Sequence, residues 1–235
     1  MNHQKRYLFL IPLFIVLIVP ILIFSKLYNP RIENIIQIEP TLDNFKVIEY
    51  YKKEYSNNEI IAKLEIPNLF NILITQSKDN EYYLNHSISK KSDKKGTEFM
   101  DYRVNINSKQ INIYGHNSQT YNLPFRKIEK YLDKKFFDEN KYIILSDDNY
   151  KSVYQILLIK EISDDFEHMK IDINNKNVVN HLDKLKENSI HYRELIYNSN
   201  TSILVLQTCS YNNQDSYYII VAIKEEWNSS FIYMI

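Results

Sequence analysis

Short apolar runs separated by polar turns dominate the chain from residue 60 onward. Runs rich in Ile, Val and Tyr are typical of β-strands, and the Asn, Asp and Ser clusters between them are typical of turns. The predicted strands are 60–66, 72–75, 111–115, 141–146, 150–162, 202–208 and 217–224. Six or seven strands of this kind predict a mainly β fold that closes, or nearly closes, into a barrel.

Helical patterns interrupt and precede these strands. One predicted helix begins at Pro124, because proline is favourable at the first helical position. A second helix is predicted over about 176–188, where apolar residues recur on one side. Residues 29–57 also favour helix, in two short stretches separated at Pro40. The fold class is therefore mainly β with added helices.

The N-terminal region has a different pattern, an uncharged apolar run from Tyr7 to Phe24. As a helix it would be about 27 Å long at about 1.5 Å per residue, close to the thickness of the hydrocarbon core of a bilayer. No face of the run is polar, which argues against a buried helix of a soluble domain. An uncleaved signal anchor is favoured over a cleaved signal peptide, because no small-x-small cleavage site follows the run.

These patterns divide the chain into three parts. Residues 1–27 are predicted to form a cytoplasmic tail and a transmembrane signal anchor, 28–59 a helical linker, and 60–235 the β-barrel domain. Either reading of the N-terminal run puts the barrel outside the cytoplasm. We therefore expect a single-pass membrane protein with an extracellular domain.

Composition narrows the possible functions. The chain has 29 basic and 29 acidic residues, a balance that argues against a nucleic-acid-binding protein. Its single Cys excludes an intrachain disulfide and a zinc site built from several cysteines. Its two Gly exclude the common glycine-rich phosphate loops. No carboxylate cluster has the spacing of a calcium loop, so we expect no metal and no cofactor.

Two residues at strand ends are candidates for chemistry. Cys209 follows the apolar run 202–208 and precedes a polar loop, a position that suits a nucleophile held on a rigid support. His116 follows the run 111–115, and Gly115 is predicted to allow a backbone turn there. A Cys and a His far apart in sequence are usual in thiol acyl-transfer enzymes. An inert buried Cys and a satisfied surface His are the alternatives.

The other histidines offer weaker partners for a thiol. His3 precedes the apolar N-terminal run, on the other side of the membrane. His86 lies in a polar loop without an evident partner. His168, His181 and His191 lie in or beside polar or helical segments, so we expect them to be solvated.

Several segments in order resemble class B sortases, the membrane-anchored cysteine transpeptidases of Gram-positive bacteria. The resemblance covers about residues 60–224. Its motifs are QSKDNEYYL (76–84), GTEFMDYR (96–103), IYGHN (113–117) and LQTCSY (206–211). Each motif alone is weak, but their order, the preceding anchor and the single Cys make the combination specific.

The resemblance implies an eight-stranded β-barrel preceded by helices, and a thioester mechanism. By position, Cys209 would be the nucleophile and His116 the general acid and then the general base, while Thr208 would shape the site. The substrates would be surface proteins that carry a C-terminal sorting motif. The acyl group would pass to an amine of a peptidoglycan precursor or of a pilin. The resemblance implies no cofactor.

The chain departs from the family eight residues after Cys209, where Tyr217 stands in place of the family's oxyanion-stabilising Arg. A tyrosine hydroxyl donates one neutral hydrogen bond, whereas a guanidinium donates a charged, forked one. Three readings are open. Tyr217 or Tyr218 acts as a weaker donor, Arg103 or Arg193 reaches in from elsewhere, or the protein binds peptides without transferring them.

Three functions are therefore compared. The first is a sortase B-like transpeptidase of the cell surface. The second is a membrane-tethered module that binds peptides on a sortase scaffold, with little or no catalysis. The third is a thiol protease, which would release acid products even when an amine is present.

Overall fold

The strands of the sequence pattern form one closed sheet. The computed structural model describes residues 47–211 and 215–225, all within the compact unit Phe45–Ile235. In these residues the strands are β1 (Ile60–Ile66), β2 (Phe70–Thr75), β3 (Phe99–Met100), β4 (Gln110–Tyr114), β5 (Tyr142–Ser146), β6 (Lys151–Ile162), β7 (His191–Tyr192), β8 (Ile203–Cys209) and β9 (Tyr217–Lys224). All seven predicted strands are present, so the prediction of a mainly β fold is confirmed.

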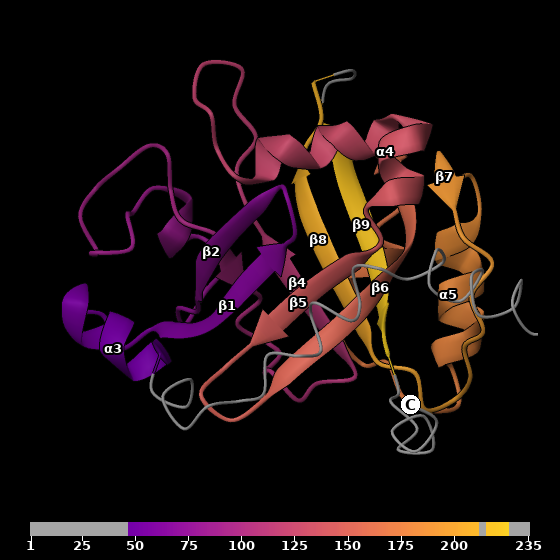
Figure 1. Cartoon of the computed structure of the whole chain (residues 1–235), viewed down its shortest axis with the longest axis horizontal. Helices are drawn as coiled ribbons and strands as arrows, with labels where there is room; N and C mark the ends of the chain where they lie inside the picture. The colour runs from indigo at the N-terminus through magenta and orange to yellow at the C-terminus, as the bar shows by residue number, and fades with distance from the viewer. Residues whose placement is uncertain (1–46, 212–214, 226–235) are drawn as a thin grey trace, which may run out of the picture. The chain divides into compact units, whose positions relative to one another are not determined.

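The sheet has the order β5-β1-β2-β3-β4-β8-β9-β6-β7, and a further pairing joins β5 to β6. That pairing closes eight strands into a barrel and leaves β7 attached to the outside edge of β6 (Figure 1). The implied eight-stranded barrel is therefore confirmed. The strands β3 and β7 were not predicted, because two residues are too few to show an alternating pattern.

Helices lie outside the barrel. They are α3 (Val47–Glu54), α4 (Lys134–Glu139) and α5 (Val178–Lys186), with short 3₁₀ helices η2 (Tyr82–Leu84), η3 (Phe125–Leu132) and η4 (Glu167–Met169). The helix predicted from Pro124 is two elements, because Asp133 is extended and its side chain accepts a hydrogen bond from Phe136 N, which starts α4. The helix predicted over about 176–188 is α5.

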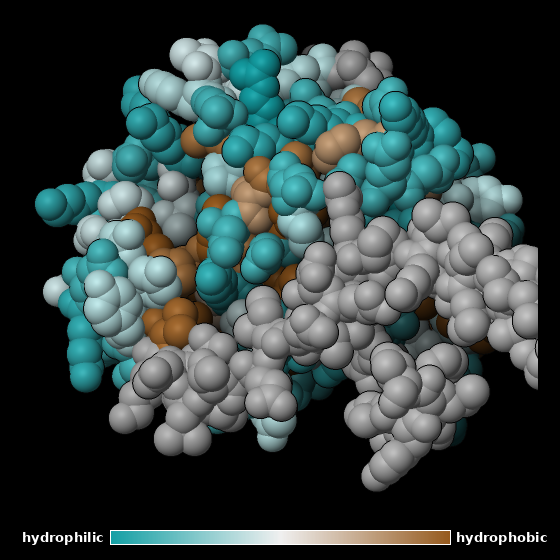
Figure 2. All heavy atoms as spheres, in the orientation of Figure 1, coloured by the Kyte–Doolittle hydropathy of each residue, from teal (hydrophilic) through white to brown (hydrophobic). Residues whose placement is uncertain are grey.

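Two apolar clusters follow from the alternation of side chains along the strands. On β8, Leu204 and Leu206 point into the barrel, where they join the larger cluster. Ile203 and Val205 point outward and pack with Leu182 and Leu185 of α5 in the second cluster. We call the side of the sheet that carries Ile203 and Val205 the outer face. On the side of the molecule seen in Figure 2, hydrophilic residues cover most of the described surface.

Most of the predicted anchor and linker region precedes the described residues. Residues 7–24 and the first part of the predicted linker lie outside the described residues. Between residues 47 and 225, wherever the structure describes the chain, no helix is both long and apolar enough to cross a membrane. The domain boundaries at 27 and 59 stay predictions.

Candidate active site on the outer face

Parallel pairing of β4 with β8 brings the two candidate residues together. The register pairs Tyr114 with Gln207, and the same offset continues past the end of β4. Gly115 N donates to Gln207 O at 3.1 Å, and Thr208 Oγ1 donates to Gly115 O at 2.9 Å. Residue 116 is therefore opposite Cys209, as the strand-end positions predicted.

Cys209 is the last residue of β8 and not the first residue of the following loop. Alternation along the regular strand puts its side chain on the outer face, two residues beyond Gln207. The residue is exposed and its thiol is free. It is thus an accessible group on a rigid element, which excludes the alternative of a sulfur buried in the barrel.

Desolvation by the surrounding groups raises the pKa of the Cys209 thiol above its usual value. Because the thiolate is the attacking species, this environment alone keeps the sulfur in its less reactive form near neutral pH. Activation of Cys209 therefore requires a base or a nearby cation.

His116 is the base that the register of β4 and β8 places opposite Cys209. Its ring nitrogen Nε2 lies 2.6 Å from Leu84 O, a carbonyl that can only accept, so Nε2 carries the proton. The lone pair of the neutral ring is then on Nδ1, the nitrogen that can exchange a proton with a thiol or an amine. Among the described residues no hydrogen bond joins His116 to the Cys209 sulfur, so the ring is held toward the loop that contains Leu84.

The two glycines of the chain both lie beside His116, one in space and one in sequence. Gly96 has φ +64°, and an added Cβ would lie 2.8 Å from His116 Cδ2. Gly115 has no positive φ, so the predicted special turn is wrong. Glycine is required at this position because there is no room for a side chain: an added Cβ would lie 2.5 Å from the ring of Phe125.

Tyr217 is directly opposite Cys209 in the antiparallel pairing of β8 with β9. Side chains of such a pair lie on the same face with Cβ atoms about 5 Å apart. Tyr217 is partly buried against the second apolar cluster. The replaced family position is therefore adjacent to the candidate nucleophile.

Arg193 does not reach this position. Its guanidinium donates to Ile156 O and Phe137 O and stacks 3.8 Å from the centroid of the Phe137 ring. Burial there lowers the pKa of Arg193 to about 10. This arginine is committed to the contact between α4 and β6, and the reading in which it supplies the missing charge is wrong.

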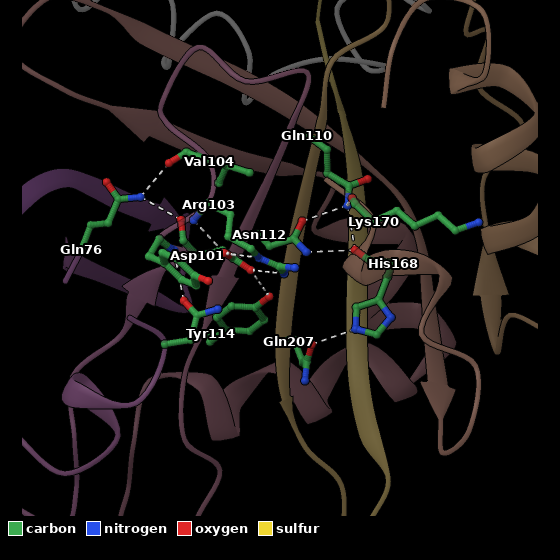
Figure 3. A network of polar contacts seen from close by, with 12 residues as sticks. Gln76, Asp101, Arg103, Val104, Gln110, Asn112, Tyr114, His168, Lys170 and Gln207 are labelled. Carbon is green, nitrogen blue, oxygen red and sulfur yellow. Dashed lines mark hydrogen bonds and ion pairs between the residues drawn. The ribbon is translucent and has the colours of Figure 1, made fainter. Parts of the chain in front are cut away.

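Arg103 lies on the outer face beside β4, but a carboxylate holds it (Figure 3). Its Nε and Nη2 donate to Asp101 at 2.9 and 2.7 Å, and Tyr114 donates to the same carboxylate at 2.7 Å. Burial opposes ionisation of Asp101, but the bonds from Arg103 outweigh it and lower the pKa of this carboxyl to about 2. The charge of Arg103 is thus neutralised by Asp101. The same carboxylate binds Tyr114, the last residue of β4, two residues before His116.

The buried cation on this face is Lys160, which the sequence analysis did not consider. It lies on β6, opposite Ile219 and two residues from the position opposite Tyr217. Only 6% of the residue is exposed, and Nζ lies 3.5 Å from Asp165. Its position within the mostly apolar strand 151–162 was the feature of the sequence that could have indicated a buried lysine.

Two histidines expected to be solvated are buried, so that prediction is wrong. His168 is 0% exposed, and its Nε2 lies 2.8 Å from Gln207 Oε1 (Figure 3). His181 is 2% exposed and contacts Glu167 and Gln110 at 2.9 and 2.7 Å. Burial lowers the pKa of both rings. They join η4 and α5 to β4 and β8, a tertiary contact that no local pattern encodes.

The remaining two described histidines bind main-chain carbonyls. His86 stacks on Tyr82 at 4.0 Å and lies 2.7 Å from Tyr82 O. His191 Nε2 lies 2.8 Å from Leu132 O. Within 47–211 and 215–225, no group of three His, Cys, Asp or Glu residues is arranged to hold a metal ion.

Glu98 lies behind Gly115, whose added Cβ would be 2.8 Å from Glu98 Cγ. It also lines a pocket of about 440 Å³ with residues of α3, β2 and the segment 96–98. Burial raises the pKa of this carboxyl to about 7. Because the pKa of Glu98 is raised in the folded state, protonated Glu98 contributes to the free energy of unfolding. This contribution is complete below the ordinary pKa of the carboxyl and is lost as the pH rises through 7.

We therefore expect Glu98→Gln to raise the free energy of unfolding at pH 8 by about 2 kcal/mol, with little change at pH 4.5. Urea unfolding at the two pH values measures this change in the free energy of unfolding. Glu54→Gln, at an exposed carboxylate that ends α3, is the matched control. Equal effects of Glu98→Gln at both pH values would contradict the assignment.

The structure thus combines a closed eight-stranded barrel with an exposed thiol at the end of β8 and a histidine that follows the paired strand β4. Comparisons with known proteins point to one family. The chain is 30% identical to Sortase B of Listeria monocytogenes over 140 residues, 58% of this chain and 56% of that protein. It is 25% identical to Sortase B of Staphylococcus aureus over 181 residues, 74% of this chain and 73% of that protein. No protein-family model matches the chain.

Solved structures give the same result. Sortase B of Clostridium perfringens has a TM-score of 0.70 and 26% identity, covering 76% of this chain and 99% of that one. A Staphylococcus aureus sortase B–substrate complex has a TM-score of 0.69 and 22% identity, covering 80% and 94%. The chain is therefore a sortase B-like protein, and the resemblance in its motifs is confirmed. The matched region spans little more than half the length of the Listeria relative.

Proposed function

We propose that this protein is a cysteine transpeptidase of the cell surface. One observation carries the proposal: Cys209 and residue 116 are opposite each other in the register of two adjacent strands, and the sulfur is exposed. In this proposal His116 Nδ1 takes the proton of the Cys209 thiol, and the resulting thiolate attacks a backbone carbonyl of a sorting motif. A C–S bond forms, the C–N bond breaks, and His116 gives a proton to the leaving amine.

In the second half of the reaction an amine attacks the thioester. His116 now takes a proton, a C–N bond forms, and the sulfur leaves. The acyl donors are surface proteins with a C-terminal sorting motif, and the acceptor is an amine of a peptidoglycan precursor or a pilin. A solved structure of Staphylococcus aureus sortase B with its substrate has a similar fold, which supports a substrate site on this barrel. The apolar run 7–24 supports a membrane anchor with an extracellular barrel.

A second candidate function is a peptide-binding module with little or no turnover. It is favoured by Tyr217, which offers no charge opposite Cys209, and by the hydrogen bond that holds His116 toward Leu84 O. In this case a sorting peptide binds but Cys209 is not acylated.

The test is to incubate the full chain with a panel of sorting-motif peptides, with and without an added amine, and to identify the products by mass spectrometry. A transpeptidase gives an amide in the presence of the amine. A thiol protease gives mainly the acid in both cases. Intact peptides after long incubation across the panel would contradict both enzymatic functions and leave the binding module.

A further inference from the structure

The side chain of Asn117 contacts the main chain of the candidate nucleophile. Its Nδ2 donates to Cys209 O at 2.8 Å and to Glu129 Oε1 at 2.6 Å. The main chain of Asn117 is bound as well, because the Tyr211 hydroxyl donates to Asn117 O at 3.0 Å. Asn117 follows His116 directly in the sequence. One residue therefore ties the chain after the candidate base to the end of β8 and to η3.

The strand β9 leaves the main chain of Cys209 without a partner on its side. In an antiparallel pair of strands, hydrogen-bonded and non-hydrogen-bonded residue pairs alternate. Ser210 N donates to Ser216 O at 2.8 Å, so the preceding pair, Cys209 with Tyr217, is of the non-hydrogen-bonded kind. The main-chain groups of Cys209 therefore point away from β9 and toward β4.

On the β4 side, the side chain of Asn117 continues the pairing after the strand has ended. Among the described residues, the bond from Gly115 N to Gln207 O, at 3.1 Å, is the last main-chain bond between the two segments. Two residues further along β8 the acceptor is Cys209 O, and its donor is the amide of Asn117, two residues past Gly115. The amide thus takes the place of a main-chain N–H at the nucleophile.

The orientation of this amide is determined by its two partners. A carbonyl and a carboxylate both accept, so Nδ2 of Asn117 and not Oδ1 must face them. The residue is only 7% exposed, and Oδ1 has no hydrogen-bond partner in the described part of the chain. Buried polar atoms without partners are uncommon in folded proteins and costly. Folding therefore satisfies the half of the amide that faces Cys209 and not the other half, which favours a role in the site over a purely structural one.

The helix η3 holds the donor in place. Glu129 lies in η3, and a hydrogen bond to a charged acceptor is stronger than one between neutral groups. The same helix binds the next part of the loop, because Arg126 Nη1 donates to Ser118 O and Gln119 O at 2.7 and 2.8 Å. The segment that follows His116 is thus attached to η3 at three consecutive residues.

We propose that Asn117 is a positioning residue of the site, which holds Cys209 in register with His116, and that Glu129 orients its amide. Asn117 contacts the main chain of Cys209 and not the sulfur, so it acts through the alignment of the pair. Without its amide, neither neighbouring strand supplies a donor for Cys209 O. The inference rests on the proposed function for the reaction that the pair performs, but the alignment itself is measurable without turnover.

The first measurement is the alkylation of the full chain by iodoacetamide, followed by intact-protein mass spectrometry. Cys209 is the single thiol, so each added group reports this residue. Asn117→Ala should lower the alkylation rate at pH 7 by about 10-fold, to the rate of His116→Ala, because the imidazole no longer meets the thiol. All three rates should converge as the pH rises above the pKa of the thiol, where ionisation needs no base.

Asn117→Asp keeps the shape of the side chain and removes the donor. Its oxygens would face the Glu129 carboxylate and Cys209 O, so this variant should react at least as slowly as Asn117→Ala. Ile143→Val is the matched control for a loss of stability, since Ile143 is buried in β5, which pairs with neither β4 nor β8. It should lower the unfolding temperature and leave the alkylation rate unchanged.

Glu129→Leu tests whether the carboxylate acts through Asn117. It should lower the alkylation rate at pH 7 by about 3-fold, and adding it to Asn117→Ala should cause no further loss. Glu129→Gln keeps an acceptor without the charge, so its rate should lie between those of Glu129→Leu and the original protein.

An alkylation rate at pH 7 that Asn117→Ala leaves unchanged would overturn the inference. So would a rate that falls in Asn117→Ala but not in His116→Ala, because Asn117 would then act on the thiol without the imidazole. A further loss of rate when Glu129→Leu is added to Asn117→Ala would remove the orienting role of Glu129.

The second measurement separates this inference from the proposed function. It uses a sorting peptide, whose acylation rate is followed on intact Cys209 and whose affinity is measured with Cys209→Ala. Asn117→Ala should lower the acylation rate constant by about 10-fold and leave the peptide affinity unchanged, since Asn117 is buried. If Cys209 is never acylated but the alkylation pattern holds, the transpeptidase proposal fails and the positioning role stands. If Asn117→Ala is acylated as fast as the original protein, the positioning inference fails alone.

Discussion

Cys209→Ala should abolish the thioester adduct and lower the rate of acyl transfer by about 10⁴-fold or more. Cys209 is the single thiol of the chain, so no other residue can form the same intermediate. Intact-protein mass spectrometry after incubation with a sorting peptide measures the adduct, and product formation measures the rate. Because the Cys209 side chain is on the exposed outer face, the substitution should leave the unfolding temperature unchanged.

His116→Ala separates this mechanism from simple thiol reactivity. The adduct should form slowly in that variant, because the raised pKa of the thiol keeps it protonated when no base assists. His86→Ala is the matched control, since His86 is bound to Tyr82 O and is not opposite Cys209 in the register of β4 and β8. Peptide binding of equal affinity to the original protein and to Cys209→Ala, with no adduct in either, would instead establish the binding module.

Tyr217→Arg should raise turnover by up to about 10²-fold. Tyr217 is directly opposite Cys209 on the outer face, so a guanidinium at this position can reach the oxygen that becomes negative when the thiolate attacks. Steady-state kinetics with a peptide that acylates Cys209 measures the change. The expected gain is in the acylation step, since that is where the charge develops.

Tyr217→Phe tests the opposite reading with a change of one atom. If the tyrosine hydroxyl is the oxyanion donor of this protein, phenylalanine should slow acylation while Tyr217→Arg gives little gain. An arginine variant that is no faster, together with a slower phenylalanine variant, would mean that the site is built around the tyrosine. Lys160 then becomes the cation to examine, because it lies on the neighbouring strand of the same face.

The sequence was sufficient to predict the barrel and the convergence of Cys209 with His116. Both predictions rest on strand ends, and strand ends are visible because apolar runs stop at polar turns. The alignment of the two residues then follows from the register of β4 and β8. Their roles in catalysis stay predictions until a thioester is observed.

Contacts between distant segments were not predictable. The burial of His168 and His181 depends on η4 and α5 packing against β4 and β8, and a polar local sequence conceals it. The role of Gly115 was misread for the same reason, since the ring that excludes a side chain belongs to Phe125 on another element. Likewise, Asn117 and Glu129 were not recognised, because the bond from Asn117 to Cys209 spans 92 residues.

The parallel pairing of β4 with β8 also has a consequence for how the protein matures. The hydrogen bond from Thr208 to Gly115 joins residues 93 positions apart, so the two strands can meet only after a long stretch of chain has been organised. Pairings of high contact order form late and slowly. A polypeptide whose β8 has not yet been synthesised therefore contains His116 without Cys209, and the candidate site is completed only late in folding.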